Sequence, residues 1–145
     1  AKLIGACCRK SVTVDERLNE VSFGRWEGSS YQTISTQFPK EARRWYCGSW
    51  ASRPPGGESL KSLERRVSEF LDEFSAKFSG KNGTCIVVTH GGPIRMFLIC
   101  LLKVKPEIFW TIRIEPASMS VFEINHRKKE LVLLNSVAHL NGCVS

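Results

Sequence analysis

The stretch that decides the fold lies at residues 84–93 and reads TCIVVTHGGP. Its first six residues form a β-branched, apolar run, which is typical of a strand buried in a parallel sheet. Gly-Gly-Pro and the apolar stretch 94–102 then predict a tight turn and a helix with proline at its first position. We therefore expect His90 at the carboxyl end of a strand, where open α/β sheets bind ligands and a following helix favours an anion such as phosphate.

His90 also has a purely structural interpretation. A histidine at a strand end can be a hydrogen-bonded capping residue with no chemical role. The glycine pair favours ligand binding, because the missing side chains at Gly91 and Gly92 let a ligand approach the backbone closely. Gly91 is therefore a candidate binding residue.

The composition predicts one globular domain spanning residues 1–145. The chain has 42% hydrophobic and 24% charged residues, which is ordinary for a soluble protein with its own core. No apolar run approaches the roughly 20 residues of a membrane span, and the start of the sequence lacks a signal-peptide pattern. We expect a cytoplasmic protein without a membrane partner.

Cysteine and charge patterns argue against metal and nucleic acid. The six cysteines include the adjacent pair Cys7 and Cys8 and contain no Cys-x-x-Cys, so we expect reduced thiols and no metal site. The formal net charge is +7, but the basic residues are scattered in pairs and triplets without a nucleic-acid motif. An anionic small substrate or a solvated surface explains this charge, and a basic nucleic-acid protein is kept as a third alternative.

Helical signals precede the deciding stretch. Residues 31–38 and 40–46 predict two short helices separated by proline, and a loop rich in Gly, Pro and Trp follows at 47–57. Ser59 then predicts a helix cap, and apolar residues recur at helical spacing from there to Phe78. This stripe is expected to face the core.

Two strand-like runs lie near the end of the sequence. Residues 120–124 and 131–135 flank a polar turn, which predicts a β-hairpin. Strands separated by helices predict an α/β fold, namely a three-layer α/β/α sandwich whose mostly parallel sheet carries this hairpin as an antiparallel addition.

Four blocks in fixed order resemble the histidine phosphatase (phosphoglycerate mutase-like) superfamily. They are DERLNEVSFGRWEG at residues 15–28, PGGESL at 55–60, VTHGGPIR at 88–95 and PASMSV at 116–121. Each block is short, but together they cover nearly the whole chain. The FGRWEG block is also similar to the small-phosphatase branch that includes α-ribazole phosphatases, although broad-specificity sugar phosphatases share it.

The resemblance implies roles for two residues. Glu20 is expected to protonate the leaving group, and His90 to hold the transferring phosphoryl group of a small phosphorylated substrate, without a metal ion or cofactor. Arg25 and Arg53 are candidate substrate contacts, and for each of them a solvated surface role is the alternative.

One part of the family pattern is missing from this sequence. Family members carry an N-terminal strand ending in Arg-His-Gly, whose histidine becomes phosphorylated, and a second phosphate-binding arginine on the next helix. His126 lies in the predicted hairpin turn and His139 beyond the last predicted strand, so neither replaces that nucleophile. We expect an N-terminally truncated domain, with the missing strand beside residues 84–89 and an edge open to another chain, including a second copy.

Three functions remain open from the sequence besides the nucleic-acid alternative given above. The first is metal-independent hydrolysis of phosphomonoesters through a phosphohistidine intermediate in the complete protein. The second is a non-catalytic remnant that acts as a binding or regulatory module. The third is a phosphotransferase of the phosphoglycerate mutase type. The resemblance implies that such mutases carry a longer insertion between the positions of Glu20 and His90, so the short interval in this chain favours a small phosphatase.

Overall fold

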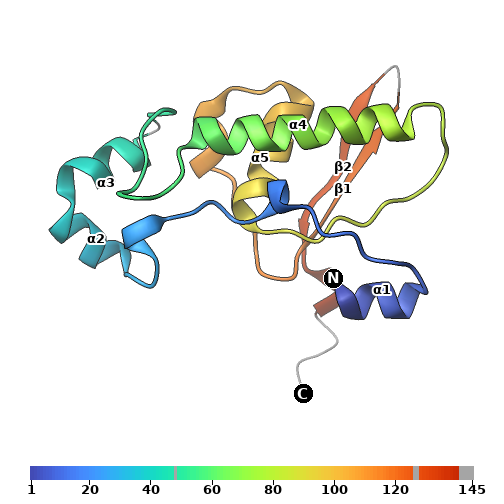
Figure 1. Ribbon diagram of the computed structural model, residues 1–145, viewed down its shortest axis with the longest axis horizontal. Helices are drawn as coiled ribbons and strands as arrows, with labels where there is room; N and C mark the ends of the chain where they lie inside the picture. Colours follow the sequence, from blue (N-terminus) through green and yellow to red (C-terminus); the bar gives the residue numbers. More distant parts are fainter. Residues whose placement is uncertain (48, 126–127, 141–145) are drawn as a thin grey trace.

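The computed structural model describes residues 1–47, 49–125 and 128–140, and it has a mixed α/β architecture. Its helices and strands are α1 (Lys2–Cys8), η1 (Glu16–Leu18), η2 (Gly24–Trp26), α2 (Tyr31–Gln37), α3 (Pro39–Tyr46), α4 (Leu60–Phe78), α5 (Gly91–Leu102), η3 (Pro106–Trp110), β1 (Met119–Ile124), β2 (Lys129–Ser136) and η4 (Ala138–Leu140), where η denotes a 3-10 helix. The α/β class expected from the sequence is confirmed. Figure 1 shows α4 as the longest element, with α2 and α3 beyond its first residues.

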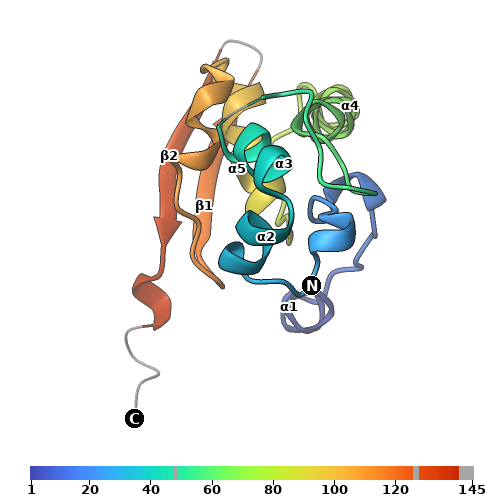
Figure 2. The ribbon, with the colours of Figure 1, turned by 90° about the vertical axis from the view of Figure 1, so that its left-hand side faces the viewer.

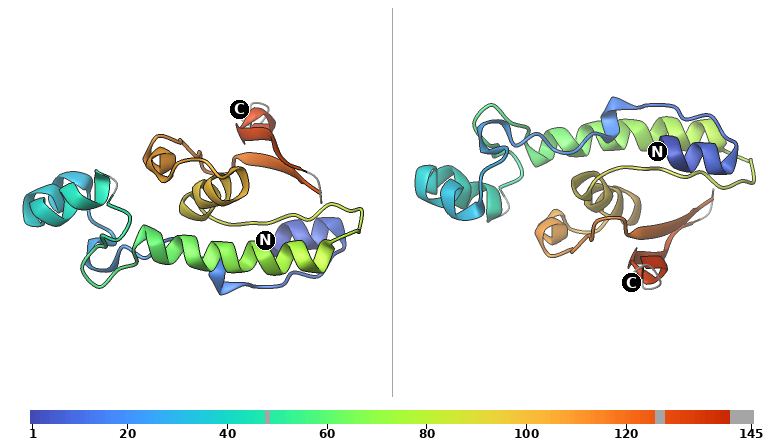
Figure 3. Two further views of the ribbon diagram at one scale, coloured as in Figure 1. Left: turned by 90° about the horizontal axis from the view of Figure 1, so that it is seen from above. Right: turned by 90° about the horizontal axis from the view of Figure 1, so that it is seen from below.

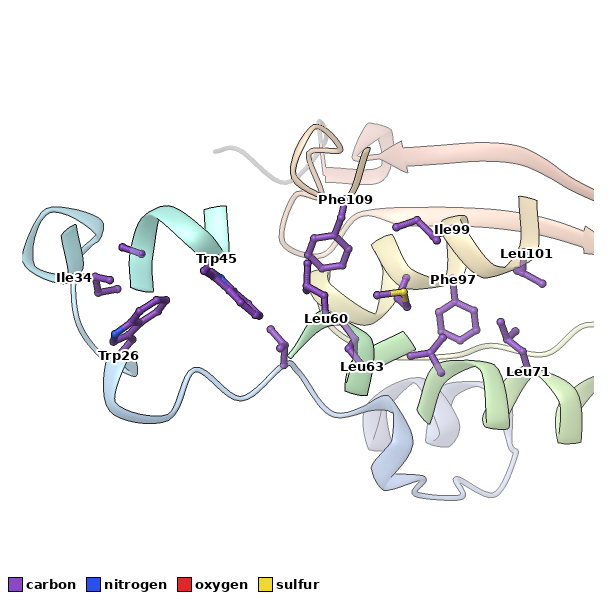
Figure 4. Packing of buried hydrophobic residues seen from close by; sticks show 14 residues of the cluster. Trp26, Ile34, Trp45, Leu60, Leu63, Leu71, Phe97, Ile99, Leu101 and Phe109 are labelled. Carbon is purple, nitrogen blue, oxygen red and sulfur yellow. The ribbon is translucent and has the colours of Figure 1, made fainter. Parts of the chain in front are cut away.

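The long helix α4 carries one wall of the core. The Ser59 hydroxyl accepts a hydrogen bond from the backbone N–H of Ser62 at 3.1 Å, so this residue caps the helix as predicted. The apolar stripe that follows is buried at Leu60, Leu63, Val67 and Leu71. Figure 4 shows Leu71 of α4 beside Phe97 of α5, with Ile99 on the opposite side of α5.

The stripe is not buried to its end, contrary to the sequence prediction. Phe78 is 42% exposed and rests on Phe74, with ring centroids 4.6 Å apart. The reason is geometric, because the last turns of α4 extend past α5 (Figure 3). Helical spacing predicts which face is apolar, and only the length of the neighbouring helix decides how much of that face is covered.

The apolar helix α5 lies at the centre and contacts α4, η3 and β2. Buried side chains on several of its faces include Met96, Phe97, Leu98, Ile99 and Leu101. His90 is the N-cap residue, so Pro93 occupies the third helical position and not the first. Proline is tolerated there because the first N–H groups of a helix have no intrahelical partner.

The helices α2 and α3 form an aromatic-rich lobe. The break predicted at Pro39 is confirmed, although Pro39 is itself the first residue of α3 and does not lie before it. Trp26 and Trp45 are buried in this lobe, and Trp45 meets the ring of Trp110 in η3 at 5.7 Å between centroids. Figure 2 shows the lobe end-on, with α3 in front of α5. The predicted loop 47–57 follows, and its residue 48 lies outside the described residues.

The hairpin predicted at the end of the chain is confirmed. β1 pairs with β2 in antiparallel register, with Val121 opposite Leu133 and Phe122 opposite Leu131. The two turn residues 126 and 127 lie outside the described residues. Among the described residues this two-stranded sheet is the whole of the β-structure.

The strand predicted at residues 84–89 does not form. The segment runs back along α4 towards α5 (Figure 3) without ladder pairing, and Ile86 and Val88 are 59% and 48% exposed. A strand requires a neighbour, and none lies beside this run among the described residues. The parallel pairing on which the predicted three-layer arrangement depends is therefore not present in the described part of the chain.

Two further expectations concern membranes and thiols. In the described ranges, no helix has both the length and the apolar character that crossing a bilayer would require. Among the described residues, Cys7, Cys8, Cys47, Cys85 and Cys100 carry free thiols, and Cys143 lies outside the described residues.

Candidate functional site

The carboxylate of Glu20 is seated on the first turn of α5. The backbone N–H of Gly92 donates to Glu20 Oε1 at 3.0 Å and to Oε2 at 3.3 Å, and the N–H of Val21 donates to Oε1 at 2.9 Å. A negative charge at this position is stabilised by the free amides and the positive end of the helix dipole. Residues 72 positions apart in the sequence are thereby brought together.

The close approach of Glu20 explains the glycine pair. A Cβ atom on Gly92 would collide with Glu20 Oε1, and one on Gly91 would lie 3.2 Å from the Nη1 atom of Arg95. The sequence argument attributed the missing side chains to a ligand. At Gly92 they make room for the carboxylate of the chain itself.

His90 stands immediately before this turn. It is exposed, and within the described part of the chain its imidazole makes no capping hydrogen bond to the start of α5. The preceding residue fixes its place, because Thr89 Oγ1 donates to the carbonyl oxygen of Leu18 at 2.6 Å. The structure thus brings His90, Gly91 and Glu20 to one place, with the imidazole open to solvent.

Arg95 belongs to the same cluster and was not selected from the sequence. Its Nε donates to the carbonyl oxygen of Ile112 at 2.7 Å, and its guanidinium lies 5.8 Å from the ring centroid of Phe109. Burial lowers the pKa of Arg95 from its ordinary value, and the negative charge of Glu20 opposes this effect. The signal available in the sequence was its place in the VTHGGPIR block, five residues after His90.

The PGGESL block supports the loop that carries Glu20. The N–H of Arg25 donates to the carbonyl oxygen of Pro55 at 3.0 Å, and the N–H of Glu58 donates to that of Ser22 at 2.8 Å. Gly24 has a φ of +52°, and a Cβ atom there would collide with the backbone at Pro55 and Gly56. Two of the sequence blocks are therefore packed backbone against backbone.

Arg25 and Arg53 are not brought into this cluster. Both side chains are exposed, and among the described residues neither guanidinium takes part in a hydrogen bond or ion pair. Their proposed contacts with substrate stay predictions. In the described ranges no group of three or more His, Cys, Asp or Glu side chains is arranged to hold a metal ion.

An open depression lies away from this cluster, at the end of α3. It is lined by Lys40, Arg43, Arg44, Cys47 and Ser49, mostly through the apolar stems of these side chains. It includes no residue of the Glu20 and His90 cluster. The candidate catalytic groups at the start of α5 thus lie outside this depression, with His90 exposed and Glu20 half-buried.

Comparison with known proteins gives consistent matches over most of the chain. Residues 1–137 match the histidine phosphatase superfamily (branch 1). The chain is 33% identical over 129 residues to phosphoserine phosphatase 1 of Hydrogenobacter thermophilus, covering 89% of this chain and 60% of that protein. It is 27% identical over 139 residues to adenosylcobalamin/alpha-ribazole phosphatase of Escherichia coli, covering 95% of this chain and 67% of that protein.

A solved structure supports the same fold. YhfR of Bacillus stearothermophilus superimposes with a TM-score of 0.82 at 19% sequence identity, covering 96% of this chain and 68% of that chain. The chain thus spans about 60 to 70% of the length of these three proteins.

Proposed function

The chain belongs to the histidine phosphatase superfamily (branch 1), and from this premise we propose that the complete protein hydrolyses small phosphomonoesters without a metal ion. The reaction passes through a phosphohistidine. Its nucleophile comes from an Arg-His-Gly segment that these 145 residues do not contain. Glu20 and His90 are the two groups that this chain contributes to the chemistry.

Each step moves one phosphoryl group and one proton. In the first, the nucleophilic imidazole nitrogen attacks phosphorus and the bond from phosphorus to the alcohol oxygen breaks. Glu20 enters this step protonated and gives its proton to that oxygen, and the N–H of Gly92 stabilises the carboxylate that results. In the second, water attacks the phosphohistidine, the phosphorus–nitrogen bond breaks, and the proton of the water passes to Glu20. The imidazole of His90 stabilises the charge on the equatorial oxygens during both transfers.

The observation that carries this proposal is the seat of the Glu20 carboxylate on the N–H of Gly92. Gly92 lies two residues after His90, so an acid and a histidine occupy the same helix start. An acid held this close to a histidine that contacts phosphate can reach the oxygen that leaves. The arrangement supports phosphoryl transfer with protonation of the leaving group.

The substrate is proposed only as a class. The relatives are named as phosphatases of phosphoserine and of alpha-ribazole, which are unlike each other apart from the phosphomonoester. Arg25 and Arg53 remain the proposed contacts to the rest of the substrate. A cytoplasmic location and the absence of a nucleic-acid partner also remain proposals.

Glu20→Gln tests the acid in the complete protein. The substitution keeps an oxygen that can accept from Gly92 and removes the transferable proton, so turnover of an aryl phosphate should fall by about 10²- to 10⁴-fold. Phosphate affinity, measured by calorimetry, should change little. The matched control is Glu16→Gln, which removes an exposed carboxylate from the same loop.

Two results would contradict the proposal. Full turnover in Glu20→Gln would remove this residue from the mechanism. Loss of wild-type turnover on treatment with a chelator, with recovery on adding a divalent cation, would require a metal-dependent reaction.

A further inference from the structure

Arg66 in α4 makes a fourfold set of hydrogen bonds beneath Glu20. Its Nε and Nη2 atoms each donate to a carboxylate oxygen of Glu58, both at 2.8 Å. Its Nη1 donates to the carbonyl oxygen of Arg17 at 2.6 Å, and Nη2 also donates to the carbonyl oxygen of Glu20 at 3.3 Å. Arg66 and Glu58 are 17% and 18% exposed at their side chains, so the pair is largely shielded from water.

Together, Arg66 and Glu58 bind the backbone on both sides of Glu20. Arg66 holds the carbonyl groups of residues 17 and 20, and Glu58 holds the following stretch through its N–H bond to Ser22. On the other side, the Glu20 carboxylate is held by Gly92. The position of the carboxylate against α5 therefore depends on a backbone that Arg66 fixes.

Arginine is the side chain that can do this. Its planar guanidinium offers five N–H donors in fixed directions, so it can bind a carboxylate with two bonds and still reach two carbonyl oxygens. A lysine carries the same charge but only one nitrogen. A pair that served only as a surface ion pair would not need the two carbonyl bonds, which span 49 and 46 residues of sequence.

We propose that Arg66, oriented by Glu58, is a positioning residue that holds Glu20 in place for proton transfer at the start of α5. The inference rests on the proposed function, because it assigns to Arg66 the geometry of the same acid. Arg66 does not touch the reacting atoms in this scheme. It acts through the backbone of Glu20, as groups behind a reactive side chain commonly do.

The test is Arg66→Lys in the complete protein. This substitution keeps the positive charge and removes the planar guanidinium with its several N–H donors. We expect kcat for an aryl phosphate to fall by about 10- to 100-fold, as for a displacement of a reacting group by about 1 Å, while KM changes by less than about threefold. The amide resonance of Gly92 in an NMR spectrum should also shift, because its hydrogen bond to Glu20 changes. Arg65→Lys is the matched control, since Arg65 precedes Arg66 on α4 and its side chain is 77% exposed.

A second variant and a second readout keep the test decisive. If Arg66→Lys does not fold, Glu58→Gln keeps both carbonyl bonds and weakens the orientation of Arg66, and it should show a smaller loss of kcat with the same Gly92 shift. A folded Arg66→Lys or Glu58→Gln protein with wild-type kcat and an unmoved Gly92 amide would overturn the inference. Failure of the proposed function has a different signature. In that case Glu20→Gln would keep full turnover, whatever the Arg66→Lys substitution does to the Gly92 amide resonance.

Discussion

At the scale of single residues, the carboxylate of Glu20 binds the backbone N–H at the start of α5, where the sequence predicted that a phosphate ligand would bind. The N–H of Gly92 is occupied by Glu20 and is therefore not free for phosphate. The amides of a helix start favour any anion, and a carboxylate from the same chain is always at hand. The carboxylate gains a fixed position from this contact, and His90 two residues earlier stays exposed.

Gly92→Ala should disturb this seat directly. The added Cβ would collide with Glu20 Oε1, so the carboxylate or the helix start must move. We expect a loss of about 1–3 kcal/mol in the free energy of unfolding, typical of overpacking, and a lower kcat in the complete protein. Gly83→Ala is the control, because a Cβ atom there meets nothing within 4 Å. Denaturant unfolding and turnover measure both effects, and normal turnover in Gly92→Ala would speak against this seat as the working position of the acid.

His90→Ala should separate chemistry from binding. If the imidazole stabilises the charge of the transferring group, kcat should fall by about 10²- to 10³-fold while phosphate affinity changes much less. His139→Ala is the control, because His139 is an exposed histidine in η4. The measurements are steady-state kinetics and a phosphate titration of the complete protein. Unchanged turnover would return His90 to a structural role.

At the scale of elements, local signals predicted well and distant ones did not. The Ser59 cap and the break at Pro39 depend on neighbouring residues, and the structure confirms both. The run 84–89 has the composition of a strand, but ladder pairing depends on a partner that its own sequence cannot supply. The same holds for the candidate site. Glu20 and His90 could be selected because each lies in a short sequence block. Arg66 could not, because it binds carbonyl groups 46 and 49 residues away in the sequence.

The two halves of α4 should differ in their contribution to stability. Leu63 is fully buried against α5, whereas Phe78 at the far end is 42% exposed. Leu63→Ala should cost about 2–5 kcal/mol of unfolding free energy. Phe78→Ala should cost less than about 1 kcal/mol despite removing a larger side chain. Denaturant unfolding of the complete protein measures the free energies of both variants. Equal losses would mean that the end of α4 is buried in the complete protein.

At the scale of the whole molecule, the described residues leave a large apolar edge uncovered. This edge is the run Ile86, Val87 and Val88, which are 59%, 39% and 48% exposed. The hairpin exposes further apolar side chains at Val121 and Val132. Exposed apolar surface of this extent marks an interaction site or an aggregation hazard. The Hydrogenobacter thermophilus and Escherichia coli relatives are about one and a half times as long as this chain, so each contains residues with no counterpart in it.

The 145-residue chain expressed by itself should therefore self-associate and lack phosphatase activity. Each exposed large apolar side chain forgoes about 1.5–3 kcal/mol, and a few of them approach a typical stability of about 5–15 kcal/mol. An unpaired extended run also offers its backbone N–H and C=O groups to another chain. Light scattering, thermal unfolding and hydrolysis of an aryl phosphate should give large or mixed species, a broad transition and no turnover.

Val87→Lys should reduce this association, because it places a charge on the exposed apolar edge. Val14→Lys should not reduce it, because Val14 is an apolar residue 83% exposed outside this edge. A monodisperse monomer with a cooperative transition would show that the edge is tolerated, and turnover in that sample would mean that the nucleophile lies within these residues.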